Sequence, residues 1–426
     1  MILVVGNVHA GSLLQWPEEG GLQTGNVIFI HPDGTSVAHW GATRNLYAGP
    51  DGMLHWDRLA RLAVYRSHMR DTFGTTSHGG GTTHAYGVKV PADSFGMSHH
   101  DPLTSLSGKS YSVMTEAMHA GMNVGIINSG SLIEPGTGAF LAHVPQRDAN
   151  EAITIQIMAS GVPIILAGGE EWLLPTNAAG RHVSAGRRTD GLDLIALARR
   201  RGYTVVYDRD ELAKVPTDTR RLLGIFAAAH TFHDDPEETL RASGLPTYEP
   251  LAPTLAEMTA AALRIFGGQT NRFFLMIEEE GTDNFSNHGN ARGMLEALHR
   301  ADEAVGVARA FRAEHPDTLV MTAADSDASG PQMIASPDAT NALPASTSFG
   351  APMDGADGLG TVPFLAAPDQ FGRRHAFGIA WIGKEDTNGG IVARAEGPNA
   401  DLLLSGCLDN TDIYRLIYAT LFGRRL

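Results

Sequence analysis

Short apolar runs alternate along this chain with segments whose apolar residues recur at helical spacing. The runs predict buried strands, and the segments between them predict helices. Strands that are connected through helices of this length form a mainly parallel sheet with helices on both faces. The pattern therefore predicts an α/β fold with three layers, α/β/α, around a mostly parallel central sheet.

The expected elements run from residue 26 almost to the C-terminus. The predicted strands are residues 26–30, 62–65, 122–127, 163–166, 203–207, 222–226, 271–277, 318–322, 376–382 and 390–395. The predicted helices are residues 37–47, 111–120, 148–159, 192–201, 254–265, 290–314 and 410–422. A single domain is therefore expected over residues 26–426, after an N-terminal extension of residues 1–25. Residues 329–374 are rich in Gly, Pro, Ala and Ser and too long for an ordinary connection, which predicts an insertion or a lid beside the site.

The composition limits the partners of the chain. With 32 basic and 47 acidic residues, its net charge of −15 disfavours nucleic acid or an anionic membrane as a partner. No apolar run reaches the ~18 residues of a transmembrane helix. The N-terminal run Met1–Gly6 lacks the basic residue and the length of a secretory signal peptide, so no leader is expected in this chain. The single Cys407 excludes an intramolecular disulfide and a cysteine-based zinc cluster.

Acidic residues follow three of the predicted strands within a few positions. They are Asp33, the run Glu278–Asp283, and Asp325. A parallel sheet brings the carboxyl ends of its strands to one edge, so these carboxylates should lie together. Gathered carboxylates repel one another, and bound divalent cations are the usual remedy. The sequence therefore predicts a metal centre at this edge.

The segment Thr75–Lys89 places a cluster of hydroxyl groups directly before three glycines and a helix-compatible stretch. Glycine lets the backbone approach a ligand closely, and a helix that starts near Gly79 would point free N–H groups at a bound phosphate. This layout suits a nucleophile. The same residues are also compatible with a polar, glycine-rich turn.

Two of these segments resemble the alkaline phosphatase family. The strand Asn26–Ile30 and the Asp33-Gly34 turn after it are similar to the first strand and metal-binding turn of that family. When the chain is aligned on Gly87-Val88-Lys89, Ser77 falls on the nucleophilic serine of the family, whereas Thr76 stands where the family has an aspartate.

The resemblance extends to two further segments and covers about residues 26–423. Phe273–Glu278 resembles the family strand that ends in the glutamate of the magnesium site. Ala139–Arg147 resembles the segment that ends in the arginine that clamps the substrate. The resemblance implies Ser77 as the nucleophile and Arg147 as the phosphate ligand, and Thr76 and Thr75 are the fallback nucleophiles. It implies metal ligands at Asp33, Asp283, Asp325 and Asp386 for two paired metals, and at Glu278 with Glu134 or Thr137 for a third.

The chain departs from the family at its imidazole ligands. Ser326 and Asp386 stand at positions where the family has histidine, and a third such position falls on Asn287, with His288 one residue further on. A slip of one residue could bring His288 to the metal. Family resemblance implies Mg²⁺ and Zn²⁺, but a ligand set rich in oxygen favours Mg²⁺, Ca²⁺ or Mn²⁺. The alternative is that His31 or His78 restores an ordinary zinc site.

These observations predict a metal-dependent phosphomonoesterase that hydrolyses small phosphate esters through a phosphoserine intermediate. A phosphodiesterase or sulfatase with the same architecture is an alternative, although the chain lacks a Cys or Ser followed by x-Pro-x-Arg, the pattern of a formylglycine nucleophile. A non-catalytic homologue that binds phosphate or metal is another, motivated by the missing histidines. The resemblance also implies a homodimer and a periplasmic or extracellular location.

Overall fold

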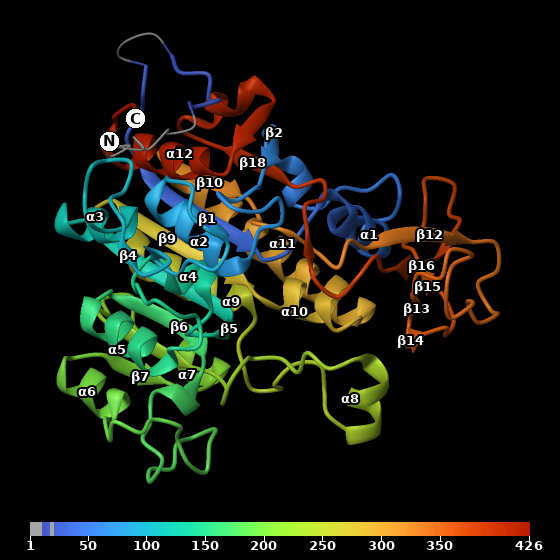
Figure 1. Cartoon of the computed structure of the whole chain (residues 1–426), viewed down its shortest axis with the longest axis horizontal. Coiled ribbons are helices and arrows are strands. Elements are labelled where there is room, and N and C mark those ends of the chain that lie inside the picture. The colour runs from blue at the N-terminus through green and yellow to red at the C-terminus, as the bar shows by residue number, and fades with distance from the viewer. Residues whose placement is uncertain (1–10, 18–20) are drawn as a thin grey trace, which may run out of the picture.

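The computed structural model describes residues 11–17 and 21–426, and a large twisted sheet lies at its centre (Figure 1). The strand order in this sheet is β19-β2-β18-β10-β1-β9-β5-β6-β8-β7. Its strands are β1 (Asn26–Pro32), β2 (Arg61–Arg66), β5 (Asn123–Ser131), β6 (Ile164–Gly168), β7 (Thr204–Val206), β8 (Leu222–Ile225), β9 (Phe273–Glu279), β10 (Thr318–Thr322), β18 (Val392–Glu396) and β19 (Cys407–Asp409). The run Met1–Gly6 lies outside the described residues.

Most neighbouring strands in this sheet are parallel. Every pair from β10 to β7 is parallel, and so is the pair of β19 with β2. The exception is β18, which runs antiparallel to both of its neighbours, β10 and β2. The prediction of a mostly parallel α/β sheet is therefore confirmed.

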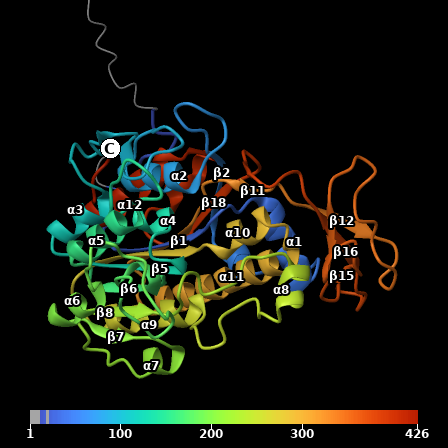
Figure 2. The same cartoon turned by 60° about the horizontal axis from the view of Figure 1, so that its bottom comes forward.

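Helices cover both faces of the sheet, so the molecule has three layers (Figure 2). Successive residues of a strand point to opposite faces. In β1, Val27 and Phe29 therefore pack into the core under α2, α3, α5, α6 and α12, while Ile28 and Ile30 pack against α9 and α11. The helices are α1 (Val37–Tyr47), α2 (Ser77–Tyr86), α3 (Val113–His119), α4 (Pro135–Gly138), α5 (Asn150–Ser160), α6 (Leu194–Arg200), α7 (Arg209–Ala213), α8 (Glu237–Ser243), α9 (Leu255–Gly267), α10 (Gly281–Asn287), α11 (Ala291–Glu314) and α12 (Thr411–Phe422).

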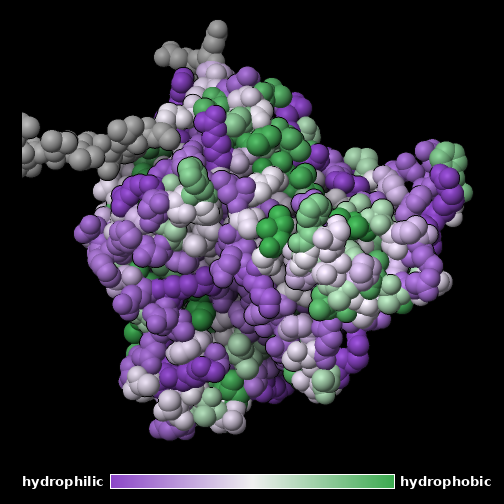
Figure 3. Space-filling model, turned by 45° about the vertical axis from the view of Figure 1, so that its right-hand side comes forward, coloured by the Kyte–Doolittle hydropathy of each residue, from purple (hydrophilic) through white to green (hydrophobic). Residues whose placement is uncertain are grey.

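A second, smaller sheet projects from one side of the molecule, at the right in Figure 1. It contains β12 (Gln332–Ser336), β13 (Met353–Gly355), β14 (Gly358–Leu359), β15 (Phe364–Leu365) and β16 (Ala376–Ala380). Residues 376–382 were expected as a closing strand of the fold, and the structure places this strand in the small sheet instead. Apolar and polar side chains are mixed on this side of the molecule (Figure 3). Among the described helices, none is both long and apolar enough to cross a membrane.

Four helices of the described structure, α4, α7, α8 and α10, were not expected from the sequence. Helix α8 lies in a segment rich in Pro, Asp and Glu, and α10 begins directly after β9, where acidic residues mask any apolar periodicity. By contrast, α1 has the predicted bounds, and α9 begins with the predicted capping box between Thr254 and Glu257.

Candidate active site

The acidic residues that follow the strands meet at the carboxyl edge of the central sheet. Asp33 follows β1, Glu280 follows β9, and Asp325 follows β10. Since β1 lies between β9 and β10 and is parallel to both, all three positions fall at the same edge. Each of these side chains is almost completely buried. The expected gathering of carboxylates is present.

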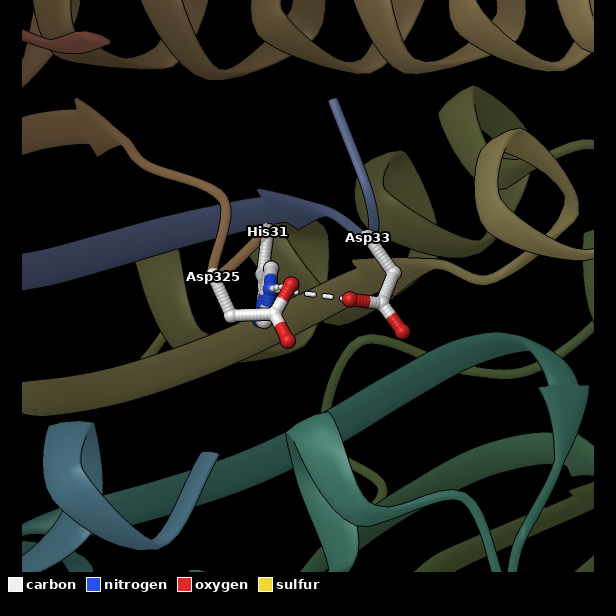
Figure 4. A group of neighbouring side chains, drawn as sticks. All are labelled: His31, Asp33 and Asp325. Carbon is white, nitrogen blue, oxygen red and sulfur yellow. Dashed lines mark ion pairs between the residues drawn. The ribbon is translucent and has the colours of Figure 1, made fainter. Parts of the chain in front are cut away.

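Two groups of possible ligand atoms share Asp33. One group consists of His31, Asp33 and Asp325, and the other of Asp33, Glu280 and Asp283, with the ligand atoms of each group within 4.8 Å of one another. Figure 4 shows the first group, in which the His31 ring lies beside both carboxylates. The backbone N–H of Gly34 donates to Asp33 Oδ1 at 3.0 Å, which fixes this carboxylate in the turn.

Burial and mutual repulsion make these carboxylates costly to ionise. Burial, followed by repulsion from neighbouring carboxylates, raises the pKa of Glu278, Glu280, Asp283 and Asp325 well above the usual range. Several buried oxygens also have no hydrogen-bond partner among the described residues. They are Asp33 Oδ2, Glu278 Oε1, Glu280 Oε2 and Asp325 Oδ2. Unpaired acceptors of one charge that converge in this way fit divalent cations.

Glu278 is held by Asn128 in β5 and by Thr137 in α4. Its Oε2 accepts hydrogen bonds from Asn128 Nδ2 at 2.5 Å and from the Thr137 N–H at 2.7 Å. A Cβ at Gly136 would lie 1.8 Å from Glu278 Oε1, so only glycine permits this close approach. Thr137 therefore lies beside Glu278, whereas Glu134 forms an ion pair with Arg147, with 3.1 Å between Oε2 and NH2.

The predicted nucleophile lies at the start of a helix. Helix α2 begins at Ser77, and the N-cap residue Thr76 accepts a hydrogen bond from the Gly79 N–H. The Thr76 hydroxyl also donates to the carbonyl of Ala92. A Cβ at Gly80 would lie 2.4 Å from Asp325 Cβ, so the glycine run allows the first turn of α2 to pack directly on the carboxyl edge of the sheet. The helix starts two residues earlier than the predicted Gly79.

Ser77, Thr76 and Arg147 line one open cavity of about 280 Å³. Asp283 and Asp386 line it as well, with Thr72, Gly74, Thr75, Asn287 and Glu385. Burial lowers the pKa of the Arg147 guanidinium, but attraction to the carboxylates of Glu134, Glu280 and Asp283 is stronger in sum, so the pKa is raised. The cavity thus combines a hydroxyl, a cation and several carboxylates.

The structure does not bring His288 into this cavity. Its side chain is 51% exposed, and Nδ1 lies 3.6 Å from Asp234 Oδ2. The preceding residue, Asn287, points inward instead, and its Nδ2 donates to both Asp283 oxygens at 3.1 Å. Successive residues of a helix point about 100° apart, so one end residue of α10 can face the site while the next faces solvent.

The segment predicted as an insertion or a lid is residues 329–374, and none of the described residues that line the cavity belongs to it. Residues 329–374 form much of the small sheet, whereas the cavity is lined by Thr72, residues 74–77, Arg147, Asp283, Asn287 and residues 385–386. Asp386 is part of this cavity wall. Its Oδ1 accepts a hydrogen bond from Asn287 Nδ2 at 3.2 Å.

Sequence reasoning missed Glu280 as a member of the site and left His31 as an alternative. The alternation of side chains along a strand could have indicated both residues. Glu278 and Glu280 are two residues apart, and so are His31 and Asp33, so the members of each pair point to the same face of the sheet. Glu279 points to the other side, where its Oε1 accepts a hydrogen bond from Ser129 Oγ at 2.6 Å.

Comparison with known proteins identifies the relatives of this chain. The sequence model of the alkaline phosphatase family matches residues 24–347, a range that contains Ser77, Arg147 and Asp325 but not Asp386. The tissue-nonspecific alkaline phosphatase of Mus musculus is 27% identical over 337 residues, which are 70% of this chain and 62% of the mouse protein. The chain therefore spans less than two thirds of the length of this relative.

Solved structures share the fold. Alkaline phosphatase from Thermus thermophilus superposes with a TM-score of 0.72 at 21% identity, over 95% of this chain and 92% of that one. The enzyme from the Antarctic bacterium TAB5 gives a TM-score of 0.70 at 16% identity, over 95% of this chain and 100% of that one. A variant of the TAB5 enzyme has been solved with Mg bound.

Proposed function

The chain belongs to the alkaline phosphatase family, and we propose that it is a metal-dependent phosphomonoesterase that acts on small phosphate esters through a phosphoserine intermediate. One observation carries the proposal. Ser77 and Arg147 line the same cavity, beside Asp283 and Asp386 and against a buried group of carboxylates. A nucleophile, an oxyanion clamp and a cation-binding edge are the parts that phosphoryl transfer requires.

Ser77 acts as the nucleophile. Its position at the first residue of α2 exposes it to the positive end of the helix dipole, which favours negative charge. Ser77 Oγ attacks phosphorus opposite the ester oxygen, the Oγ–P bond forms as the bond to the leaving alcohol breaks, and the serine proton is released. Water then attacks the phosphoserine, which releases inorganic phosphate and restores the hydroxyl.

Arg147 holds the phosphoryl group during both transfers. Its planar guanidinium can donate to two non-bridging oxygens at once, which the ammonium of lysine cannot. The side chain is 47% exposed, so it can turn into the cavity, and the ion pair with Glu134 limits its range.

The carboxyl edge would hold the metal ions. Asp33, Asp283 and Asp325, with Glu280 and Asp386 beside them, fit two cations, and Glu278 with Thr137 or Glu134 fits a third. Bound there, divalent cations would favour ionisation of the Ser77 hydroxyl and neutralise charge on the phosphoryl oxygens. The positions that offer oxygen donors alone favour Mg²⁺, Ca²⁺ or Mn²⁺.

The proposal is tested with Ser77→Ala and 4-nitrophenyl phosphate. Turnover should fall by several orders of magnitude while the circular dichroism spectrum is unchanged. Ser243→Ala, at an exposed position at the end of α8, is the matched control. Acid-quenched wild-type protein should carry a phosphoryl group on the peptide that contains Ser77, as detected by mass spectrometry.

Two outcomes would redirect the proposal. Activity that survives Ser77→Ala but is lost in Thr76→Ala would move the nucleophile by one residue. A panel with bis(4-nitrophenyl) phosphate and 4-nitrophenyl sulfate separates the phosphodiesterase and sulfatase alternatives, and no turnover of any ester with added metals would indicate a non-catalytic binding protein.

A further inference from the structure

His31 is a buried histidine for which the described residues provide no hydrogen-bond partner. It lies in β1, two residues before Asp33, and its side chain is fully buried. Neither Nδ1 nor Nε2 has a hydrogen-bond partner among the described residues. A buried imidazole without partners is costly, so its surroundings should explain it.

The ring is packed so that Nε2 faces two carboxylates. Phe29 stacks on the ring with an interplanar angle of 8°, and His84 meets it edge to face. Nε2 lies 3.4 Å from Asp33 Oδ1 and 3.5 Å from Asp325 Oδ1 (Figure 4). Both distances exceed the ~2.7–3.2 Å of an ordinary hydrogen bond that a ring nitrogen donates.

These distances match the edges of a metal-ligand tetrahedron. Zinc binds histidine nitrogen and carboxylate oxygen at about 2.0–2.2 Å, and tetrahedral geometry then separates neighbouring ligand atoms by about 3.3–3.6 Å. The two separations from His31 Nε2 fall in this range. The ligand atoms of all three residues also lie within 4.8 Å of one another.

The two groups that share Asp33 differ in donor chemistry. Asp33, Glu280 and Asp283 offer oxygen alone, whereas His31, Asp33 and Asp325 offer one nitrogen and two oxygens. Imidazole suits zinc and cobalt, and all-oxygen sets suit magnesium, calcium and manganese. Ser326, the residue after Asp325, is buried but contributes only a hydroxyl.

We propose that His31 is a metal ligand, so that the His31–Asp33–Asp325 position selects a zinc-like cation while the Asp33–Glu280–Asp283 position takes a hard cation. The two cations therefore differ in kind. This inference rests on the proposed metal requirement of the enzyme, but its test does not depend on turnover.

The first test uses the wild-type protein after chelation and reloading. We expect one equivalent of Co²⁺ to give the intense visible absorption of a low-coordinate site. X-ray absorption of the protein loaded with one equivalent of Zn²⁺ should show the outer-shell scattering of one imidazole. A first shell made of oxygen alone would overturn the assignment.

The second test uses His31→Ala. The intense cobalt bands should disappear, and zinc affinity should fall by more than about 100-fold, because losing even an indirect partner of a metal ligand costs 10- to 100-fold. Mn²⁺ binding at the oxygen-only position should persist, which also shows that the variant is folded. Added imidazole should restore the cobalt bands by entering the space left by the ring. His288→Ala, at the exposed end of α10, is the control and should bind both metals as wild type does.

The outcomes also separate this inference from the proposed function. A protein that binds zinc through His31 but hydrolyses no ester would refute the proposed activity and leave the ligand assignment standing. A protein that hydrolyses phosphate monoesters, but whose zinc affinity is unchanged in His31→Ala, would refute the role of His31 and leave the activity standing.

Discussion

Glu237 is a buried carboxyl where α8 meets the small sheet, and replacing it with glutamine should stabilise the protein above neutral pH. Its side chain is 8% exposed, and Oε1 accepts a hydrogen bond from the Arg292 N–H at 3.0 Å, but Oε2 has no partner among the described residues. Burial, assisted by the nearby Asp354 carboxyl, raises the pKa of Glu237 to about 8. Asp354 belongs to β13, so this electrostatic repulsion acts between α8 and the small sheet.

The sign of the effect follows from proton binding. Below pH 4.5 the carboxyl is protonated in both states and contributes no penalty. Between pH 4.5 and about 8 the unfolded chain releases the proton and the folded chain keeps it, so the free energy of unfolding falls as pH rises. A rise from 4.5 to about 8 corresponds to an upper limit of roughly 5 kcal/mol. Because relaxation and water reduce this limit, we expect about 1–3 kcal/mol, the usual cost of an unsatisfied buried polar group.

Urea unfolding at pH 5, 6, 7 and 8 measures the effect in Glu237→Gln and wild type at one fixed metal concentration. The glutamine keeps the acceptor for the Arg292 N–H and carries no charge. The variant should gain little at pH 5 and most at pH 8, whereas the exposed control Glu314→Gln should track wild type. A difference between Glu237→Gln and wild type that does not change with pH would refute the reasoning.

Two further predictions concern the site. Arg147→Lys should lower kcat/KM by about 10- to 100-fold through the loss of one charge-assisted hydrogen bond worth about 1.5–3 kcal/mol, and it should weaken inhibition by inorganic phosphate. A phosphate inhibition constant equal to that of wild type would remove Arg147 from the site. Chelation should lower Tm more at pH 8 than at pH 5 in scanning calorimetry. Without cations, the raised pKa values of Glu278, Glu280 and Asp325 mean that the folded protein loses stability as pH rises, because these buried carboxyls resist ionisation that the unfolded chain undergoes freely. An equal fall in Tm at both pH values would contradict this account.

The sequence by itself determined the features that depend on neighbours along the chain. The apolar run that became β1, the helix at residues 37–47 and the capping box at Thr254 follow from local periodicity and end signals. The shared edge followed as well, because the carboxyl ends of parallel strands lie at the same edge of a sheet. Asp33, the run Glu278–Asp283 and Asp325 could therefore be predicted to lie along one edge.

Tertiary structure decided which residue of each acidic segment reaches the site. The register of β1 against β9 pairs His31 with Glu278, and Asp325 follows β10 on the other side of β1. The strand order makes these three strands neighbours, and the sequence does not state that order. The unexpected helix α10 turned Asn287 inward and His288 outward. Residues 376–382 read as a strand in the sequence, but only long-range pairing with β12, β13 and β15 placed that strand in the small sheet. Local patterns indicate whether a segment is a helix or a strand. Which strands it pairs with depends on contacts with residues tens to hundreds of positions away, which no single segment contains.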